Sequence, residues 1–343
     1  MTAPKVPIRA AGERRVLVTG ATTPVGAALV RRLLDAGAAR VIAVGAKGSD
    51  GVDRLPLDDP RLTLVHVDLS RSRSRRRLLY GVALEERVDT VADGAIHRSA
   101  STRGLRAHEL NVESTRELLT LAERHPTIEA YVLRSFAEVY RVTPRLPTVL
   151  DEGHPLELGP RNPQWLRDRV EADVIACTRM GMSRLRITVL RAAECFGPDT
   201  GSQLWDYLQS RVCFRPAGFD PTVNLLSVDD AAKALSLAVL TEAQGIYNIP
   251  GADTLPLTRV IRFYGRRDYA VIEPLLYPLY ALRARTIGRD FRYRLNRAKF
   301  HFSGVMDGSK AARELGYIPS HPIDWPDEAE LREAAPRPTT EAP

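Results

Sequence analysis

The chain has 343 residues, of which 44% are hydrophobic and 27% charged, and its formal net charge at pH 7 is +7. This composition is that of a folded globular protein, and the length allows one large α/β domain or two coupled lobes. No apolar stretch approaches the ~20 residues that a membrane span needs. Residues 1–10 lack the apolar core of a signal peptide, and the three cysteines show neither disulfide nor metal-ligand spacing. We therefore expect a cytoplasmic protein without a metal site.

The first predicted unit is a strand, a glycine-bearing turn and a helix. Residues 16–18 form an apolar run typical of a buried parallel strand, and apolar residues three and four apart predict a helix over 25–34. Such a turn can place backbone N–H groups and a helix N-terminus against a pyrophosphate. Thr23, however, stands where a middle glycine would let the phosphate approach. The unit therefore indicates either a dinucleotide site or a ligand-free strand–turn–helix. The dinucleotide would contact Thr19, Gly20, Thr22, Thr23, Val25 and Gly26.

The alternation of strands and helices continues along the chain. An arginine-rich segment, residues 71–77, lies in a predicted helix that ends near Glu86, and further helices are expected over 105–123 and 164–180. Repeated alternation predicts an α/β fold, a Rossmann-type doubly wound parallel sheet with right-handed crossovers. Its other strands are predicted at 41–44, 62–67, 88–92, 129–133 and 186–190.

After residue 198 the pattern loosens. Helices are expected at 203–212 and 229–240, with short strands at 223–226 and 246–249. We predict that this later part closes over the ligand site at the carboxyl ends of the strands. The predicted segments are a flexible tail (1–13), a dinucleotide-binding Rossmann domain (14–198), a smaller substrate lobe interleaved with the sheet (199–320) and an acidic tail (321–343).

Several strand ends, in order, carry residues that match one set of family motifs. The matching stretches are 19–26, 68–69, 94–95, 111–115, 137–140, 190–198, 228–232 and 307–316. Over about residues 15–319 the chain resembles the extended short-chain dehydrogenase/reductase group, the NAD-dependent epimerase/dehydratase family. The resemblance implies an NAD or NADP cofactor and a homodimer formed through helices 105–123 and 164–180. It also implies that Asp68 and Leu69 contact the adenine and that Gly94 and Ala95 lie along the cofactor. Asn111 would brace a helix.

The catalytic positions depart from the family. Members that perform chemistry use a Ser or Thr, a Tyr that moves a proton, and a Lys four residues after the Tyr on the same helix face. Here Trp165 stands at the Tyr position and Arg169 at the Lys position. An indole N–H is only a donor, whereas Arg169 keeps its charge and could still bind a ribose or a phosphate. Phe136 aligns with the catalytic Ser, and a one-residue shift would place Ser135 there instead.

The residues expected to bind the cofactor also depart from the family pattern. Gly45 stands where an Asp would bind the ribose 2′-hydroxyl, and Lys47 follows two residues later. A missing acid with a nearby cation favours NADP over NAD, although Lys47 is equally compatible with an exposed loop position. Asp93 occupies a position where the family usually has a His. An acid beside the cofactor would disfavour an anionic ligand unless it is protonated or paired.

Three classes of function follow from these residues. The first is an NAD(P)-binding protein that lacks the Tyr–Lys pair and is a non-catalytic or weakly active binding or sensing protein with an unidentified small-molecule ligand. The second is an active NAD(P)-dependent oxidoreductase or epimerase whose catalytic groups have moved to Ser135, Tyr140, Glu138 or His97. The third is a membrane-surface or nucleic-acid binding protein, in which the apolar, aromatic and basic residues 275–299 contact anionic lipid or nucleic acid; alternatively, residues 275–282 cap a substrate pocket and the arginines are solvated. Nucleic acid is the less favoured partner.

Overall fold

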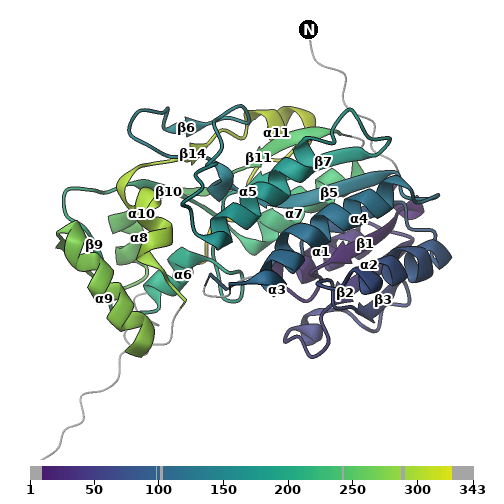
Figure 1. Cartoon of the computed structure of the whole chain (residues 1–343), viewed down its shortest axis with the longest axis horizontal. Coiled ribbons are helices and arrows are strands. Elements are labelled where there is room, and N and C mark those ends of the chain that lie inside the picture. Colours follow the sequence, from purple (N-terminus) through teal and green to yellow (C-terminus); the bar gives the residue numbers. More distant parts are fainter. Residues whose placement is uncertain (1–9, 98, 101–102, 242, 287–289, 327–343) are drawn as a thin grey trace, which may run out of the picture.

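The computed structural model describes residues 10–97, 99–100, 103–241, 243–286 and 290–326 (Figure 1). Seven parallel strands form the central sheet in the order β11-β7-β5-β4-β1-β2-β3. The doubly wound parallel sheet expected from the sequence is therefore confirmed. The strands span β1 (Arg15–Thr19), β2 (Arg40–Gly45), β3 (Leu62–His66), β4 (Thr90–Asp93), β5 (Ala130–Phe136), β7 (Arg186–Ala192) and β11 (Gly245–Ile249).

Helices cover both faces of the sheet, and the side chains of β1 show how. Val16 and Val18 pack in the layer that contains α1 (Pro24–Asp35) and α7 (Val228–Leu240). Leu17 points to the opposite layer, because successive side chains of a strand alternate between the two faces. That layer contains α2 (Ser72–Leu78), α4 (Ser114–Glu123) and α5 (Gln164–Cys177). Apolar burial on both faces explains why these strands are continuous apolar runs.

Two predicted helices are interrupted. The range 105–123 forms α3 (Leu105–His108), a π-helical turn (Glu109–Glu113) and α4, and α2 runs into a second π-helical turn (Leu79–Ala83). Single π turns occur often at functional sites, and the first one contains Asn111. The helix predicted over 203–212 is too long, since α6 (Gln203–Leu208) ends before the chain enters a strand at Val212.

Most of the later chain forms a smaller lobe with an aromatic core (left in Figure 1). Tyr207 packs on Phe300 with ring centroids 4.9 Å apart, and Tyr280 packs on Phe291 at 4.8 Å. β11 and α7 also come from the later chain but join the main sheet and α1. The remaining strands are β6 (Val149–Leu150), β8 (Glu194–Cys195), β9 (Val212–Pro216), β10 (Thr222–Leu226), β12 (Asp253–Pro256), β13 (Arg267–Val271) and β14 (Val305–Met306). The remaining helices are α8 (Leu257–Phe263), α9 (Glu273–Thr286), α10 (Tyr293–His301) and α11 (Ser309–Glu314).

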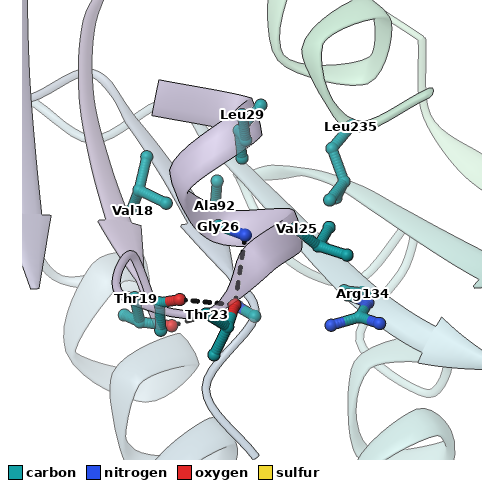
Figure 2. Close-up of a pocket in the computed structure, with 11 residues that line it drawn as sticks. Val18, Thr19, Thr23, Val25, Gly26, Leu29, Ala92, Arg134 and Leu235 are labelled. Atoms are coloured by element: carbon teal, nitrogen blue, oxygen red, sulfur yellow. Dashed lines mark hydrogen bonds between the residues drawn. The ribbon is translucent and has the colours of Figure 1, made fainter. Parts of the chain in front are cut away.

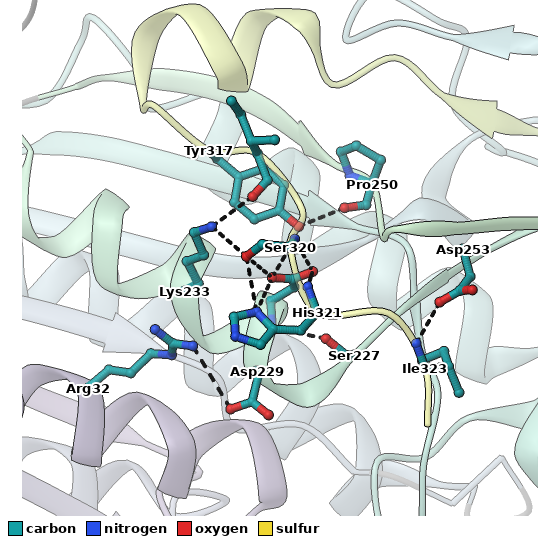
Figure 3. A network of polar contacts seen from close by, with 12 residues as sticks. Arg32, Ser227, Asp229, Lys233, Pro250, Asp253, Tyr317, Ser320, His321 and Ile323 are labelled. Atoms are coloured by element: carbon teal, nitrogen blue, oxygen red, sulfur yellow. Dashed lines mark hydrogen bonds and ion pairs between the residues drawn. The ribbon is translucent and has the colours of Figure 1, made fainter. Parts of the chain in front are cut away.

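A segment near the C-terminus is tied to the start of α7 (Figure 3). The buried carboxylate of Asp230 accepts hydrogen bonds from the backbone N–H groups of Ser320 and His321, each at 2.9 Å. Burial acts to raise the pKa of Asp230, but the bonds from His321 and Ser320 outweigh it and lower that pKa. Lys233 on α7 binds the carbonyl of Ile318 at 2.8 Å. These contacts fix the end of the described chain against the helix that covers the sheet.

The predicted tails lie largely outside the described residues. Residues 1–9 and 327–343 are not described, and Ala11–Glu13 form a single 3-10 turn before β1. Among the described residues, none of the helices is both long enough and apolar enough to span a bilayer.

Candidate functional site

The glycine turn after β1 is packed too tightly for side chains (Figure 2). Gly20 has φ +65°, and a Cβ there would lie 2.8 Å from the carbonyl oxygen of Gly94. A Cβ on Gly26 would lie 2.2 Å from the carbonyl oxygen of Gly20. Thr23 is the N-cap of α1, and its hydroxyl donates to the Gly20 carbonyl at 2.8 Å and accepts from the Gly26 N–H at 3.1 Å. Because Thr23 is used inside the turn and Pro24 has no N–H, fewer helix-end donors face a ligand than in a three-glycine turn.

Asp93, at the end of β4, is bound by hydroxyl groups inside the protein. Its buried carboxylate accepts hydrogen bonds from Thr19 Oγ1 at 2.6 Å, Tyr131 Oη at 2.5 Å and Thr115 Oγ1 at 3.1 Å. Thr19 Oγ1 in turn accepts from the backbone N–H of Gly94 at 3.0 Å and of Ala95 at 3.1 Å. Asp93 is therefore paired with three donors, which is the exception that the sequence analysis allowed.

The side chains at the family's Ser, Tyr and Lys positions form one stack. The Arg169 guanidinium carbon lies 3.8 Å from the ring centroid of Trp165 and 3.9 Å from that of Phe136. Trp165 is 7% exposed and Arg169 is 6% exposed. This geometry is a buried cation–π sandwich, which is worth on the order of 2 kcal/mol per desolvated contact. We call Phe136, Trp165 and Arg169 the stack.

A chain of buried charges continues from the stack into the smaller lobe. Arg169 Nη1 lies 3.4 Å from Glu138 Oε2, and Lys299 Nζ on α10 binds Glu138 at 2.7 Å and Glu194 at 3.1 Å. Burial acts to raise the pKa of Glu138, but the charges of Lys299 and Arg169 outweigh it and lower that pKa to about 2. Burial lowers the pKa of Arg169 to about 10. A carboxylate with so low a pKa is a poor proton acceptor at neutral pH, so Glu138 is badly suited to be a general base.

Ser135 and Tyr140 belong to a second buried network. Ser135 Oγ donates to Asp173 Oδ2 at 2.5 Å, and Arg191 binds both oxygens of Asp173 at 2.7 and 3.0 Å. Tyr140 Oη donates to Asn248 at 2.6 Å and accepts from Arg191 at 3.2 Å. Burial raises the pKa of Tyr140 to about 12. Both hydroxyls are thus held by α5, β7 and β11, and Ser135 points to α5 rather than into the stack.

Arg134, one residue earlier on β5, was not singled out by the sequence. It lines a small cavity beneath the glycine turn, together with Thr23, Val25 and Leu235 (Figure 2). It also borders a second small cavity lined by Asn111, Ser135, Phe136 and Arg169, among others. Its guanidinium forms no hydrogen bond with another described residue, and its Nε is buried. Burial lowers the pKa of Arg134. Sequence reasoning could have identified Arg134, because an arginine at the carboxyl end of a predicted central strand lies where ligands bind in this kind of fold.

Three N–H donors at this site are buried without an acceptor among the described residues. They are Arg134 Nε, Trp165 Nε1 and Arg169 Nε. A buried unsatisfied donor costs roughly 1–3 kcal/mol, and such groups are uncommon in folded proteins. All three come from the carboxyl end of β5 and the facing turns of α5. Since each is a donor and none accepts, the site is suited to a ligand rich in oxygen acceptors.

The comparisons with known proteins agree with this geometry. Residues 16–250 match the model of the NAD dependent epimerase/dehydratase family. The chain belongs to this family. An uncharacterized protein of Mycobacterium tuberculosis is 30% identical over 318 residues, which are 89% of this chain and 80% of that protein. A 3-diazoavenalumate denitrifying reductase of a Streptomyces species is 28% identical over 310 residues, covering 84% of this chain and 98% of that protein.

Solved structures show the same fold at low identity. UDP-glucose 4-epimerase of Thermus thermophilus, in complex with NAD, has a TM-score of 0.69 and 18% identity, over 93% of this chain and 99% of its own. The dTDP-glucose 4,6-dehydratase of Bacillus anthracis, also with NAD, has a TM-score of 0.67 and 19% identity, over 90% and 92% of the two chains. These likenesses establish the architecture of the epimerase/dehydratase family.

The predicted cofactor residues fall into three groups. Thr19, Gly20, Thr23, Val25, Gly26 and Gly94 surround the cavity beneath the glycine turn. Gly94, Ala95, Asn111 and Arg169 line the second small cavity. Thr22, Lys47, Asp68 and Leu69 line neither cavity. They lie at the carboxyl ends of β1, β2 and β3.

Asn111 acts as a brace between loop and helix. Its Oδ1 accepts from the His97 N–H at 2.8 Å, and its Nδ2 donates to Asp168 on α5 at 3.2 Å. At the β2 end, Lys47 is exposed, and a Cβ on Gly45 would lie 2.7 Å from Thr22 Cγ2. An acid at position 45 would therefore require Thr22 to move.

Proposed function

We propose that this protein binds an NAD(P) dinucleotide at the carboxyl ends of β1, β4 and β5 and has lost the proton transfer of active family members. The observation that carries the proposal is the set of three buried, acceptor-less N–H groups of Arg134, Trp165 and Arg169. Ribose hydroxyls and phosphate oxygens are acceptors that would satisfy such donors. None of the three side chains gains or loses a proton near neutral pH, so the same groups cannot serve as general acids or bases.

The residues present fit the cofactor in part. The bare backbone at Gly20, Gly26 and Gly94 forms a tight cradle, and Arg134 would supply charge that compensates for the donors lost at Thr23 and Pro24. When bound, the nicotinamide would supply or accept a hydride. The protein's residues would orient the dinucleotide through donors and would hold no mobile proton beside it. We therefore infer a binding or sensing protein with little or no epimerase or dehydratase activity.

We further propose NADP as the preferred form. Position 45 has no acid for a ribose 2′-hydroxyl, and the exposed Lys47 follows at the end of β2. A cation in this place favours a 2′-phosphate.

A thermal-shift series with NAD⁺, NADH, NADP⁺ and NADPH tests binding. A dinucleotide at ~100 times its Kd stabilises the folded state by about 2.7 kcal/mol, which gives a clear rise in melting temperature. In parallel, UDP-glucose and dTDP-glucose are incubated with the protein and cofactor. We expect binding and no conversion of either sugar nucleotide. Efficient conversion that is abolished by Ser135→Ala or Tyr140→Phe would refute the loss of proton transfer.

The Streptomyces relative favours a second candidate, a reductase whose chemistry needs no proton from the protein. Hydride from NAD(P)H can add to the terminal nitrogen of an arenediazonium ion. The resulting diazene then loses N₂ and leaves a C–H bond. Such a reaction would tolerate Trp165 and Arg169 at the Tyr and Lys positions. Anaerobic NADPH oxidation with an arenediazonium salt, coupled to N₂ release, tests it, and a rate equal to the protein-free control would exclude it.

A further inference from the structure

An apolar surface covers the outer side of α9 and the adjoining strand β13. Ile272, Leu275 and Leu282 are 62%, 50% and 60% exposed, and Tyr269 on β13 is 50% exposed. Pro274, Pro278 and Ala281 are also exposed on the helix. The opposite side of α9 is apolar as well, because Leu276 and Tyr280 are buried. An exposed apolar surface on a helix whose other side is already buried in the core indicates an interaction site. We call the exposed residues of this surface the α9 patch: Tyr269, Ile272, Pro274, Leu275, Pro278, Ala281 and Leu282.

The helix that carries the patch is firmly held from its inner side. Tyr280 Oη donates to the Phe214 carbonyl of β9 at 2.8 Å and accepts from the Phe214 N–H at 3.0 Å. The Phe214 ring also lies 6.3 Å from the rings of both Tyr269 and Tyr280, which connects β13 to α9. In Figure 1, α9 lies at the edge of the molecule, on the side away from the seven-stranded sheet. The patch is therefore a rigid, outward-facing surface rather than a frayed end.

The charges around the patch are basic. Arg267 is exposed on the same face of β13 as Tyr269, two residues away. The nearby acids are already paired, Asp268 with Arg215 at 2.9 Å and Glu273 with Arg297. Not every basic residue of 283–299 contributes, since Arg283 is buried and Lys299 belongs to the charge chain of the site. Among the described residues, the unpaired charge at the rim of the patch, that of Arg267, is therefore positive.

We propose that the α9 patch docks the protein onto an anionic membrane surface. Apolar and aromatic side chains beside a basic residue such as Arg267 are typical of interfacial segments that insert below lipid headgroups. A second copy is a poorer occupant, because a two-fold contact would bring the same basic rims together. Residues 327–343 are also a poor cover, since Leu331 is their only large aliphatic residue. Anionic lipid offers both negative charge for the basic rim and an apolar layer for the patch, whereas these acidic residues offer only the charge.

Co-sedimentation of the full-length protein with vesicles tests the proposal. We expect binding to vesicles of phosphatidylcholine with about 30% phosphatidylglycerol and little binding to phosphatidylcholine alone, because anionic lipid supplies the surface potential. Raising NaCl from about 0.05 to 0.5 M should weaken binding by screening. The double variant Ile272→Asp with Leu275→Asp should bind at least ~10-fold more weakly, because two apolar anchors become anions. Arg267→Gln should weaken binding about fivefold.

A matched control separates the patch from general surface effects. Leu57→Asp with Met182→Asp adds the same charge at two exposed apolar residues of the main domain and should bind like wild type. Circular dichroism and melting temperatures establish that every variant is folded. The proposal is overturned if wild type fails to sediment with anionic vesicles, or if the Ile272/Leu275 variant binds as well as wild type. A dimer in light scattering that this variant dissociates, without vesicle binding, would assign the patch to a second copy and equally overturn it.

Discussion

Glu138 gives the sharpest test of the buried charges that replace the family's catalytic groups. Its side chain is 8% exposed and bridges Arg169 and Lys299. Lowering its pKa from the ordinary 4.5 to about 2 corresponds to roughly 3 kcal/mol of stability at neutral pH, at ~1.4 kcal/mol per pH unit. The variant Glu138→Gln keeps the size of the side chain and removes its charge. We therefore expect it to lose about 3 kcal/mol, in line with the roughly 3–5 kcal/mol seen when one partner of a buried ion pair is removed.

The pH dependence of this loss is equally specific. Because the folded pKa of Glu138 lies below its unfolded value, the carboxylate stabilises the folded state fully above pH 4.5, and this contribution disappears as the pH falls from about 4.5 toward about 2. Wild type should therefore lose stability more steeply over that range than Glu138→Gln does.

Urea and thermal unfolding at a series of pH values supply the assay. At neutral pH the Glu138→Gln variant should melt on the order of 5 °C below wild type. The exposed Glu85, for which no hydrogen bond or ion pair is seen among the described residues, is the matched control, and Glu85→Gln should melt like wild type. If Glu138→Gln costs less than about 1 kcal/mol, or follows the wild-type pH profile, the carboxylate is not held between the two cations as described.

Three further expectations follow from the same structure. Asp173→Asn leaves the buried Arg191 without its counter-ion and should cost about 3–5 kcal/mol in urea unfolding; a loss under 1 kcal/mol would show that Arg191 finds another partner. Asp93→Asn removes one of the two acceptor oxygens that three hydroxyls bind and should cost about 2–3 kcal/mol, whereas unchanged unfolding would mean that these hydroxyls find other acceptors. Lys47→Glu should weaken NADP binding by at least ~10-fold and NAD binding much less, with Arg211→Glu as an exposed control; equal effects on both dinucleotides would rule out a 2′-phosphate contact.

The fold was predictable because its signals are local. The apolar runs and their helical partners lie close together in the chain, and each strand of the main sheet was expected within a few residues of its observed bounds. The strand pair β9 and β13 was not expected, since it joins segments more than fifty residues apart whose partners are set by the aromatic core.

The site was predictable only as a set of positions. The sequence placed Trp165 and Arg169 on one helix face, but it could not show that Phe136 completes a stack around the guanidinium. Lys299 reaches Glu138 from 161 residues away along the chain, which no spacing rule anticipates. Asp93 was expected to lie beside a ligand. Its hydroxyl partners could not be foreseen, because they come from three separate elements, β1, α4 and β5. Networks assembled from several elements are properties of the folded chain.

Titration calorimetry of the dinucleotides against wild type and Arg134→Met tests whether the protein binds a dinucleotide beside Arg134. We expect micromolar binding of NADPH or NADH to wild type and a loss of roughly 10- to 100-fold in Arg134→Met, the range expected for a charge-assisted hydrogen bond of about 1.5–3 kcal/mol. Absence of binding by every dinucleotide at about 1 mM, a concentration at which even a Kd of ~1 mM gives half-saturation, would contradict it. Equal affinity of wild type and Arg134→Met would show that Arg134 is not part of the cofactor site.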